Sequence, residues 1–412
     1  MAHVAYISFD VVPAPKGAAT HIEAFARALA PVELVTVAAG SDPEARIERW
    51  PGVFHTALPA LGASAIDRVL CFRRYLARWL ASRRFDAIQF RSSFEGMPLT
   101  ALRPVPHLVF EVNGLPSIEL KYRYPRAADD RELLAKLIAQ ERACLRAATL
   151  IVTPSSVTRR FLAAERGADP AKIRVIPNGV DTTTFAGRRN RLPHLTADRC
   201  PSWVGQAVSP AHQPADSLRL LYFGTLTPWQ GVGLAVRALA MVNAQTPATL
   251  TVIGAAGRRQ TDGLAALASK LSVGAQLRIL PGIPQSELVQ HLHQADVVLA
   301  PLTINDRNTV QGCCPLKILE SMAAGVPVIA SDLEVVRELG RHEEHLLLFK
   351  PGSVDQIAAA ALRLYNEPQF AAALTERARE HVLANFTWDG AATALRAAYR
   401  EFGINLSSTA AS

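Results

Sequence analysis

Two successive series of short apolar segments, separated by amphipathic stretches of helical period, constrain this chain most. The first series lies within residues 1–185 and the second within residues 218–385. Short apolar runs of this kind are typical of strands buried on both faces of a sheet. Because a helix between two strands forces a parallel connection, each series predicts a doubly wound α/β domain. The runs are HVAYISF, VELVTVA, FDAIQF, HLVFEV, TLIVTP and IRVIP, then LRLLYFG, TLTVIG, QLRILPG, DVVLAP, VPVIA and HLLLF.

Length and local composition predict where these domains begin and end. At 412 residues the chain is too long for a single hydrophobic core. Residues 1–185 and 218–385 form the two predicted Rossmann-like domains, and ligands of such sheets bind at the carboxyl ends of the strands. We therefore expect the site in a cleft where the two domains face each other. Residues 186–217, rich in Pro, polar and basic side chains, are a predicted linker or insertion, and 386–412 a last amphipathic helix with a frayed tail.

Composition indicates the class of protein and its compartment. A hydrophobic content of 49% and a charged content of 19% exclude a disordered chain. The five cysteines are an odd number without CxxC or Cys/His metal spacing, which favours a reducing cytosol and predicts no metal site. The N-terminal MAHVAYISFDVV has no charged leader region, and no apolar run is long enough to cross a bilayer. The expected location is cytoplasmic.

The positive charge of the chain is uneven. The net charge of +8 originates in the first 200 residues, which carry 28 basic and 19 acidic side chains. Part of it lies between Arg68 and Arg84, where arginines alternate with apolar residues in an amphipathic helix. A solvated face over a packed stripe is one interpretation. Contact with an anionic membrane surface or an acidic acceptor is the other.

The segment QGCCPLKILESMAAGVPVIASD, residues 311–332, reads as a loop, a short helix, a glycine turn and a buried strand. Pro315 suits the first turn of a helix, and Gly325 suits its end. Lys317 and Glu320 lie three residues apart and so share one helical face. A cation and a carboxylate presented together suit a ligand with both phosphate and hydroxyl groups, such as a nucleotide sugar.

Three polar loops follow strands of the second series. YFGTLTPWQG carries Gly224 and Gly231 and presents backbone N–H groups suited to a phosphate. IGAAGRRQTDG carries Arg258, and LTINDRNTVQGCCP carries Arg307. Three such loops in one domain favour a nucleoside diphosphate as the ligand.

The first series also ends in polar residues. Gly17 lies in a loop that enters a helix bearing His21, and a helix N-terminus attracts anions. Arg91 and Glu95 follow one strand, and Glu111 and Asn113 end the next. Buried polar groups need partners, so these residues either form a substrate wall or pair with one another and with the backbone. The first alternative makes Glu111, His21 and Arg91 the catalytic candidates and places Glu95 and Asn113 on the acceptor side.

Taken together, these motifs resemble the GT-B glycosyltransferases of family 4 over nearly the whole chain. The matching segments are GAATH, IRVIPNGVDTTTF, FGTLTPWQG, ADVVLAP, PLKILESMAAGVPVIASD and the closing FTW helix. The resemblance implies that this C-terminal helix, within residues 386–412, crosses back and packs on the first domain. The resemblance implies transfer of a sugar from a nucleoside-diphosphate sugar to an acceptor, with retention of configuration and without a metal or other cofactor. Glu320 matches the family glutamate that binds the ribose hydroxyls, and Gly17 matches the loop near the donor phosphates. The first domain would hold an acceptor that the sequence does not identify.

The chain departs from the family pattern at three positions. The family phosphate loop usually reads G-R-L-x-x-x-K-G, whereas Thr225 and Gln230 stand here in place of the two cations. Gly312 stands where the family carries a glutamate eight positions before Glu320. Lys317, with Arg307 or Arg258, is the predicted replacement for the missing cations. Glu111 falls roughly where many relatives place a histidine facing the sugar.

Two alternatives remain open at this point. A nucleotide-sugar epimerase or hydrolase would use Glu95, Glu111 and His21 as acid and base groups. A basic membrane-surface or nucleic-acid binding module would explain the charge of the first half. Nucleic acid is disfavoured as a partner, because the arginines are not interleaved with exposed aromatics and no nucleic-acid motif appears.

Overall fold

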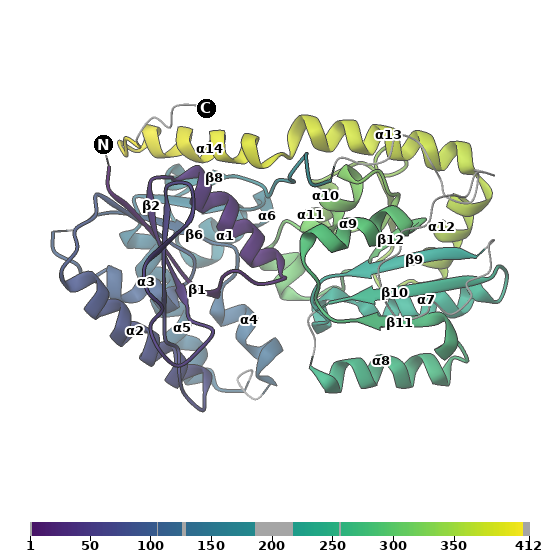
Figure 1. Ribbon diagram of the computed structural model, residues 1–412, viewed down its shortest axis with the longest axis horizontal. Helices are drawn as coiled ribbons and strands as arrows, with labels where there is room; N and C mark the ends of the chain where they lie inside the picture. The colour runs from purple at the N-terminus through teal and green to yellow at the C-terminus, as the bar shows by residue number, and fades with distance from the viewer. Residues whose placement is uncertain (1, 105, 126–128, 186–216, 255–256, 407–412) are drawn as a thin grey trace. The chain divides into compact units, whose positions relative to one another are not determined.

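A parallel sheet organises each of two structural units, as the alternating apolar runs predict (Figure 1). The computed structural model describes the chain except residues 1, 105, 126–128, 186–216, 255–256 and 407–412. Nearly all of the predicted linker and most of the predicted C-terminal tail lie outside the described residues.

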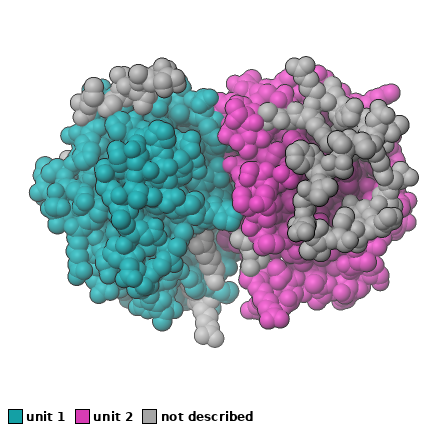
Figure 2. All heavy atoms as spheres, in the orientation of Figure 1, with its two compact units in different colours: residues 1–179, 305–314, 388–412 teal, residues 180–304, 315–387 magenta. Residues whose placement is uncertain are grey.

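The two units, coloured separately in Figure 2, are not contiguous in sequence. Unit 1 comprises residues 1–179, 305–314 and 388–412, and unit 2 comprises residues 180–304 and 315–387. The division differs from the sequence-based boundaries mainly at residues 305–314. This polar loop comes from the second half of the chain but packs within unit 1, through contacts described below.

The sheet of unit 1 has the strand order β3-β4-β2-β1-β5-β6-β7-β8. All of its pairings are parallel except that of β3 with β4, which is antiparallel. The strands are β1 (Val4–Val11), β2 (Val32–Val37), β3 (Ile47–Trp50), β4 (Val53–Leu58), β5 (Ala87–Phe90), β6 (His107–Glu111), β7 (Leu150–Thr153) and β8 (Ile173–Val175).

Helices cover both faces of this sheet, which explains why its central strands are apolar without interruption. In β1, Ala5 and Ile7 belong to one core cluster, while Val4 and Tyr6 belong to the other, as the two-residue period of a strand requires. The first cluster includes side chains of α2 (Ala65–Ala81), α3 (Ser93–Leu99), α4 (Pro116–Arg123), α5 (Arg131–Ala147) and α6 (Ser156–Arg166). The second includes α1 (Gly17–Ala28) and α14 (Trp388–Glu401).

Two strands of unit 1 escape the sequence-based prediction. β3 and β4 form a hairpin at the edge of the sheet, and β3 is partly exposed and polar. β4 contains His55, whose Nε2 lies 2.7 Å from the Thr36 hydroxyl and whose Nδ1 accepts from Arg49 at 3.0 Å. Because polar residues interrupt both segments, neither reads as an apolar run.

Unit 2 contains a wholly parallel sheet with the order β11-β10-β9-β12-β13-β14. Its strands are β9 (Leu218–Phe223), β10 (Ala248–Ile253), β11 (Leu277–Leu280), β12 (Val297–Ala300), β13 (Val328–Ser331) and β14 (Leu347–Phe349). The main core cluster joins this sheet to α7 (Val232–Asn243), α8 (Arg258–Lys270), α12 (Val354–Asn366) and α13 (Pro368–Asn385). The remaining α-helices are α9 (Gln285–Gln294), α10 (Leu316–Ala323) and α11 (Glu334–Arg337).

Short helical turns complete the connections. η2 (Pro170–Lys172), η4 (Pro228–Gln230) and η5 (Gly274–Gln276) are 3-10 turns, and η6 (Arg307–Gln311) is a π-helical turn. Within the described part of the chain, no helix is both long enough and apolar enough to cross a membrane.

Candidate functional site

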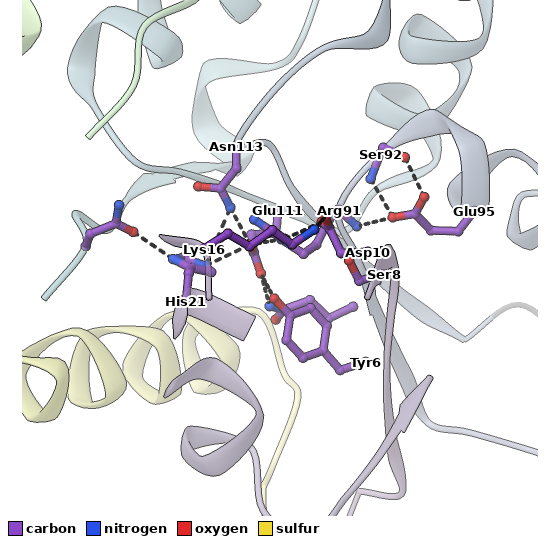
Figure 3. Close-up of polar contacts among 12 residues, drawn as sticks. Tyr6, Ser8, Asp10, Lys16, His21, Arg91, Ser92, Glu95, Glu111 and Asn113 are labelled. Atoms are coloured by element: carbon purple, nitrogen blue, oxygen red, sulfur yellow. Dashed lines mark hydrogen bonds and ion pairs between the residues drawn. The ribbon is translucent and has the colours of Figure 1, made fainter. Parts of the chain in front are cut away.

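Three predicted site residues of unit 1, His21, Arg91 and Asn113, contact Glu111 at the carboxyl end of β6 (Figure 3). Its side chain is almost fully buried, and it accepts hydrogen bonds on both carboxylate oxygens. The donors come from β1, β5, the residue that follows β5, α1 and the loop after β6. They are Tyr6 Oη at 2.6 Å, Gln89 Nε2 at 2.6 Å, His21 Nε2 at 2.8 Å, Arg91 Nε at 2.8 Å, and Asn113 Nδ2.

These contacts keep Glu111 ionised. Burial alone would raise the pKa of its carboxyl, but the charges of His21 and Arg91 and the hydrogen bonds lower that pKa to about 2. A carboxylate so fully satisfied is suited to holding its neighbours in place. The structure therefore gives Glu111 a positioning role toward His21 and Arg91, and its predicted catalytic role stays a prediction.

Arg91 extends the network toward the loop at the start of α1. Its Nη1 donates to Asp10 at 3.0 Å, and the other oxygen of Asp10 accepts from Lys16 Nζ at 2.7 Å. Burial would lower the pKa of Arg91, but Glu111, Tyr6 and Asp10 raise it above its ordinary value. Lys16 is the N-cap residue of α1 and directly precedes Gly17. Asp10 and Lys16 are the more exposed members, so the cationic end of the network reaches the surface.

His21 is held from two sides. Its Nε2 faces Glu111, and its Nδ1 lies 2.7 Å from Asn178 Oδ1. The orientation of the Asn178 amide is fixed, because its Nδ2 donates to the carbonyl of Cys314 at 2.7 Å. Asn178, in the NGVD segment, is thus part of the network, although the sequence analysis did not single it out.

Glu95 shows the pairing alternative that the sequence left open. It is fully buried and accepts from the backbone N–H groups of Arg91 at 3.0 Å and Ser92 at 2.8 Å, and from the Ser92 hydroxyl. With Ser92 it forms the capping box of α3. Burial raises its pKa to about 7, although these hydrogen bonds lower it. Its assignment to the acceptor side remains a prediction.

In unit 2, Lys317 reaches the loop where the family carries its phosphate-binding cations. Its side chain is 7% exposed, and Nζ donates to Gln230 Oε1 at 2.6 Å. The same Nζ lies 4.1 Å from the ring centroid of Tyr222, at the end of β9. The ammonium of Lys317, a residue of α10, therefore contacts the β9–η4 loop directly.

The β9–η4 loop is shaped to admit this amine. Gly224 has a φ of +123°, and a Cβ there would lie 3.3 Å from Lys317 Nζ. The Tyr222 hydroxyl donates to the carbonyl of Thr225 at 2.7 Å, which fixes the turn. Gly231 ends η4 and is the N-cap residue of α7. Gly224, Thr225, Gln230 and Lys317 thus form one cluster.

Glu320 lies one turn further along α10. It is 7% exposed and accepts a hydrogen bond from Gln285 Nε2, at the start of α9, over 2.9 Å. Burial raises the pKa of the Glu320 carboxyl to about 7, against the opposing effects of the Gln285 hydrogen bond and the charge of Lys317. The carboxyl is therefore buried with much of its hydrogen-bonding capacity available to a ligand.

Arg258 and Arg307, the two further predicted donor cations, each lie beside a carboxylate. The side chain of Arg258 is 95% exposed on α8, with Asp262 at 3.9 Å. Arg307 belongs to unit 1, where its Nε donates to Glu119 of α4 at 3.0 Å. Their predicted roles as donor cations rest on the sequence alone.

Gly312 also belongs to unit 1, and its surroundings explain why the family glutamate is missing. Its φ is +83°, and a Cβ there would lie 2.7 Å from the hydroxyl of Ser155 and 2.8 Å from that of Thr158. Ser155 is the N-cap residue of α6. Residues 305–314 therefore pack so closely on α6 that no side chain fits at this position.

Several members of these networks were not singled out from the sequence. Tyr6 and Gln89 interrupt otherwise apolar strands, which is a usable signal, since a buried polar side chain needs a partner. Tyr399 of α14 joins them by donating to Gln89 Oε1 at 2.7 Å. Tyr222, in the apolar strand β9, carries the same signal as Tyr6, whereas Gln285 carries none. Among the described residues, no group of three His, Cys, Asp or Glu side chains is arranged to hold a metal ion.

Two family models match the two halves of the chain. The model of glycosyl transferases group 1 matches residues 209–381, and that of glycosyltransferase family 4 matches residues 15–184. A D-inositol 3-phosphate glycosyltransferase of Kineococcus radiotolerans is 31% identical over 338 residues, which cover 78% of this chain and 72% of that protein. The chain belongs to the family 4 glycosyltransferases, enzymes that transfer a sugar from a nucleotide sugar.

Other relatives agree with this membership. The protein of the same name from Thermomonospora curvata is 28% identical over 291 residues, covering 69% of this chain and 64% of that protein. Among solved structures, sucrose-phosphate synthase from Thermosynechococcus elongatus has a TM-score of 0.77 at 19% identity, covering 97% of this chain and 99% of the other. Anabaena HepE, solved with UDP and glucose, has a TM-score of 0.70 at 15% identity, with coverages of 97% and 100%. These structural likenesses confirm the predicted GT-B fold.

Proposed function

We propose that this glycosyltransferase binds the diphosphate of its donor through Lys317 and the ribose through Glu320. The observation that carries the proposal is the position of Lys317 Nζ, 2.6 Å from Gln230 in the loop where the family places a lysine. The Lys317 ammonium, on α10, thus supplies the positive charge that the family lysine provides and Gln230 does not. Stabilising the leaving diphosphate by a fixed cation is a large contribution to sugar transfer, because negative charge develops there.

The test compares ligands with and without phosphate. Lys317→Met should weaken UDP binding about tenfold or more while changing uridine binding little, since the lost interaction is a charge-assisted contact with phosphate. Glu320→Gln should weaken both. Lys270→Met and Glu376→Gln, on exposed positions of the same unit, are matched controls. Thermal shifts and calorimetric affinities measured with UDP, GDP, TDP and ADP would also identify the base that the site prefers.

Two results would overturn this assignment. Equal effects of Lys317→Met on nucleoside and nucleoside diphosphate would show that Lys317 does not contact phosphate. Unchanged binding in Glu320→Gln would remove the ribose contact. Incubating the donor sugar without acceptor, and finding an epimer or free sugar as the main product, would favour an epimerase or hydrolase.

We further propose that unit 1 binds the acceptor near the network of Glu111, with His21 and Arg91 as the groups that face the reacting sugar. The relative from Kineococcus is named for an inositol phosphate, so a phosphorylated polyol is the first acceptor to try. Lys16 at the start of α1 is the most accessible cation of this network. Lys16→Met should raise the KM for such an acceptor and leave the KM for the donor unchanged.

Retention of configuration and independence of metal ions are also proposed for the reaction. The support is the family membership, together with the cation that Lys317 supplies to the diphosphate. NMR of the first-formed product would distinguish retention from inversion. Activity that survives extensive treatment with EDTA would agree with metal independence, and activity lost with EDTA and restored by Mg²⁺ would contradict it.

For localisation, we propose a cytoplasmic enzyme with peripheral contact between α2 and an anionic membrane. Ile66 and Leu70 are exposed large apolar residues at 52% and 49%, and exposed Arg74 and Arg78 continue the same i, i+4 stripe. Such a stripe suits the boundary of an anionic bilayer. Other arginines of this region contact protein groups; Arg73, for example, donates to the carbonyls of Phe94 and Ser93.

Flotation with liposomes tests the membrane contact. Binding should require anionic lipid and fall with salt, and Ile66→Ser with Leu70→Ser should reduce it. Arg160→Ser, an exposed arginine of α6, is the control. Equal flotation with neutral and anionic liposomes, or none with either, would contradict the proposal.

A further inference from the structure

Glu320 receives a hydrogen bond from a residue that belongs to none of the family motifs. Gln285 is the first residue of α9, directly after Pro284, whose φ of −57° helps to start that helix. Its Nε2 lies 2.9 Å from Glu320 Oε1. Gln285 and Glu320 are 35 residues apart, on different helices of unit 2. The contact therefore depends on the fold and not on local sequence.

The charged groups around this carboxyl are few among the described residues. Lys317 lies on the same helix, with its amine on the β9–η4 loop. Arg379 of α13 packs against the end of α10 by donating to the carbonyl of Ala323 at 3.2 Å. Gln285 is the recorded hydrogen-bond donor to Glu320, and it donates to one oxygen only. Within the described part of the chain no hydrogen bond to Oε2 accompanies it, so that oxygen can accept from a ligand.

We infer that Gln285 is a positioning residue for donor binding: its amide fixes Glu320 Oε1, so that the carboxylate presents its remaining acceptor sites to the two ribose hydroxyls. This inference rests on the proposed ribose contact of Glu320. A carboxylate accepts two hydroxyl donors only when it is ionised and correctly rotated. The amide donor favours both conditions, because it stabilises the ionised form and restricts the last side-chain torsion.

The hydrogen bond from Gln285 affects the protonation state of Glu320. Burial raises the pKa of Glu320 to about 7, and the Gln285 hydrogen bond opposes that rise. Removing the amide would raise the pKa further, so a larger fraction of the carboxyl would be protonated at neutral pH. Loss of Gln285 should therefore shift binding of the ribose toward higher pH.

The experiment measures the affinity for the tightest binder among UDP, GDP and ADP, and for its 2′,3′-dideoxy counterpart, between pH 6 and pH 9. Gln285→Leu keeps the size of the side chain and removes the donor. It should weaken binding of the ribose nucleotide at pH 7 about tenfold. The midpoint of its pH profile should move upward relative to the wild-type profile. Binding of the dideoxy nucleotide should change little, because it lacks the hydroxyls.

Gln285→Lys is the second variant, to be compared with Gln285→Leu. It restores a donor and adds a cation, so its pH midpoint should move below that of the wild type. A merely structural role for Gln285 would weaken both nucleotides equally without moving either midpoint, and would overturn the inference. If Glu320→Gln weakens ribose-nucleotide binding while Gln285→Leu does not, the inference fails and the proposed function stands. If Glu320→Gln has no effect, the proposed function fails first and this inference with it.

Discussion

Glu111 of unit 1 and Glu320 of unit 2 are both buried carboxyls among the predicted site residues, but their surroundings shift their pKa values in opposite directions. Glu111 accepts from Tyr6, Gln89, His21, Arg91 and Asn113, and its pKa falls to about 2. Glu320 accepts from Gln285, and its pKa rises to about 7. Burial acts on both, so the difference lies in the number of donors and nearby positive charges.

The difference separates two kinds of site residue. Glu111 has used its hydrogen-bonding capacity within the protein, and its removal leaves His21 and Arg91 buried without their shared anion. Glu320 is costly to the free protein, since an ionised carboxyl is buried with few donors, and a ligand with hydroxyl groups would satisfy it. Unsatisfied polar capacity, more than burial, marks the position where a ligand is expected.

The largest expected effect tests the structural side of the comparison. Glu111→Gln should lower the free energy of unfolding by about 3–5 kcal/mol, because it breaks a buried charge network by removing one partner. Urea unfolding measures it, with Glu23→Gln on the exposed side of α1 as control. A loss below about 1 kcal/mol, typical of a surface substitution, would show that Glu111 is not the centre of the network.

A smaller effect tests why only one of the two family glutamates is present. Gly312→Ala should lower the free energy of unfolding by about 1–3 kcal/mol, since the backbone is strained for a side chain and the new Cβ meets α6. Gly352→Ala is a matched control, because its φ of +87° is similar but its Cβ would meet open space. Equal effects of the two substitutions would show that the packing on α6 contributes nothing.

The pH dependence of donor binding sharpens the contrast between the two carboxyls. Glu320 binds hydroxyl groups in its ionised form, so affinity should be constant well above pH 7 and fall as the pH drops through 7, by up to about tenfold per unit. Glu111 stays ionised throughout this range. Calorimetry at pH 6 and pH 8 measures the slope. Glu320→Gln should remove the pH dependence of affinity that comes from ionisation of Glu320. An unchanged slope in that variant would show that another group causes the pH dependence.

The sequence predicted those parts of the fold and site that depend on local patterns. Strands buried on both faces were found because they are apolar without interruption, and the edge hairpin β3–β4 was missed because it is not. Lys317 and Glu320 were found together because three residues separate them on one helix.

Local sequence patterns could not predict contacts between residues that are far apart in the sequence. The sequence did not indicate the ion pair of Arg307 with Glu119, because it joins residues 188 positions apart. The placement of residues 305–314 in unit 1 follows from that contact and from Gly312, neither of which the local sequence indicates. Gln285 was missed for the same reason, since one glutamine at the start of a helix has no distinctive signal.

The central claim is that Glu320 is maintained for a ligand at a cost to the free protein, and one measurement tests it most directly. The melting temperature of Glu320→Gln is compared with that of the wild type at pH 8, with and without the nucleoside diphosphate. A carboxyl whose folded pKa is raised contributes stability that is present below its unfolded pKa and lost as the pH rises through 7, so the wild type is penalised at pH 8.

The account predicts that Glu320→Gln melts about 2–4 °C higher than the wild type without ligand and shows a smaller rise than the wild type when the nucleotide is added. The wild type should show the ligand-dependent rise. A lower melting temperature of Glu320→Gln without ligand, together with an unchanged rise on adding nucleotide, would contradict the account.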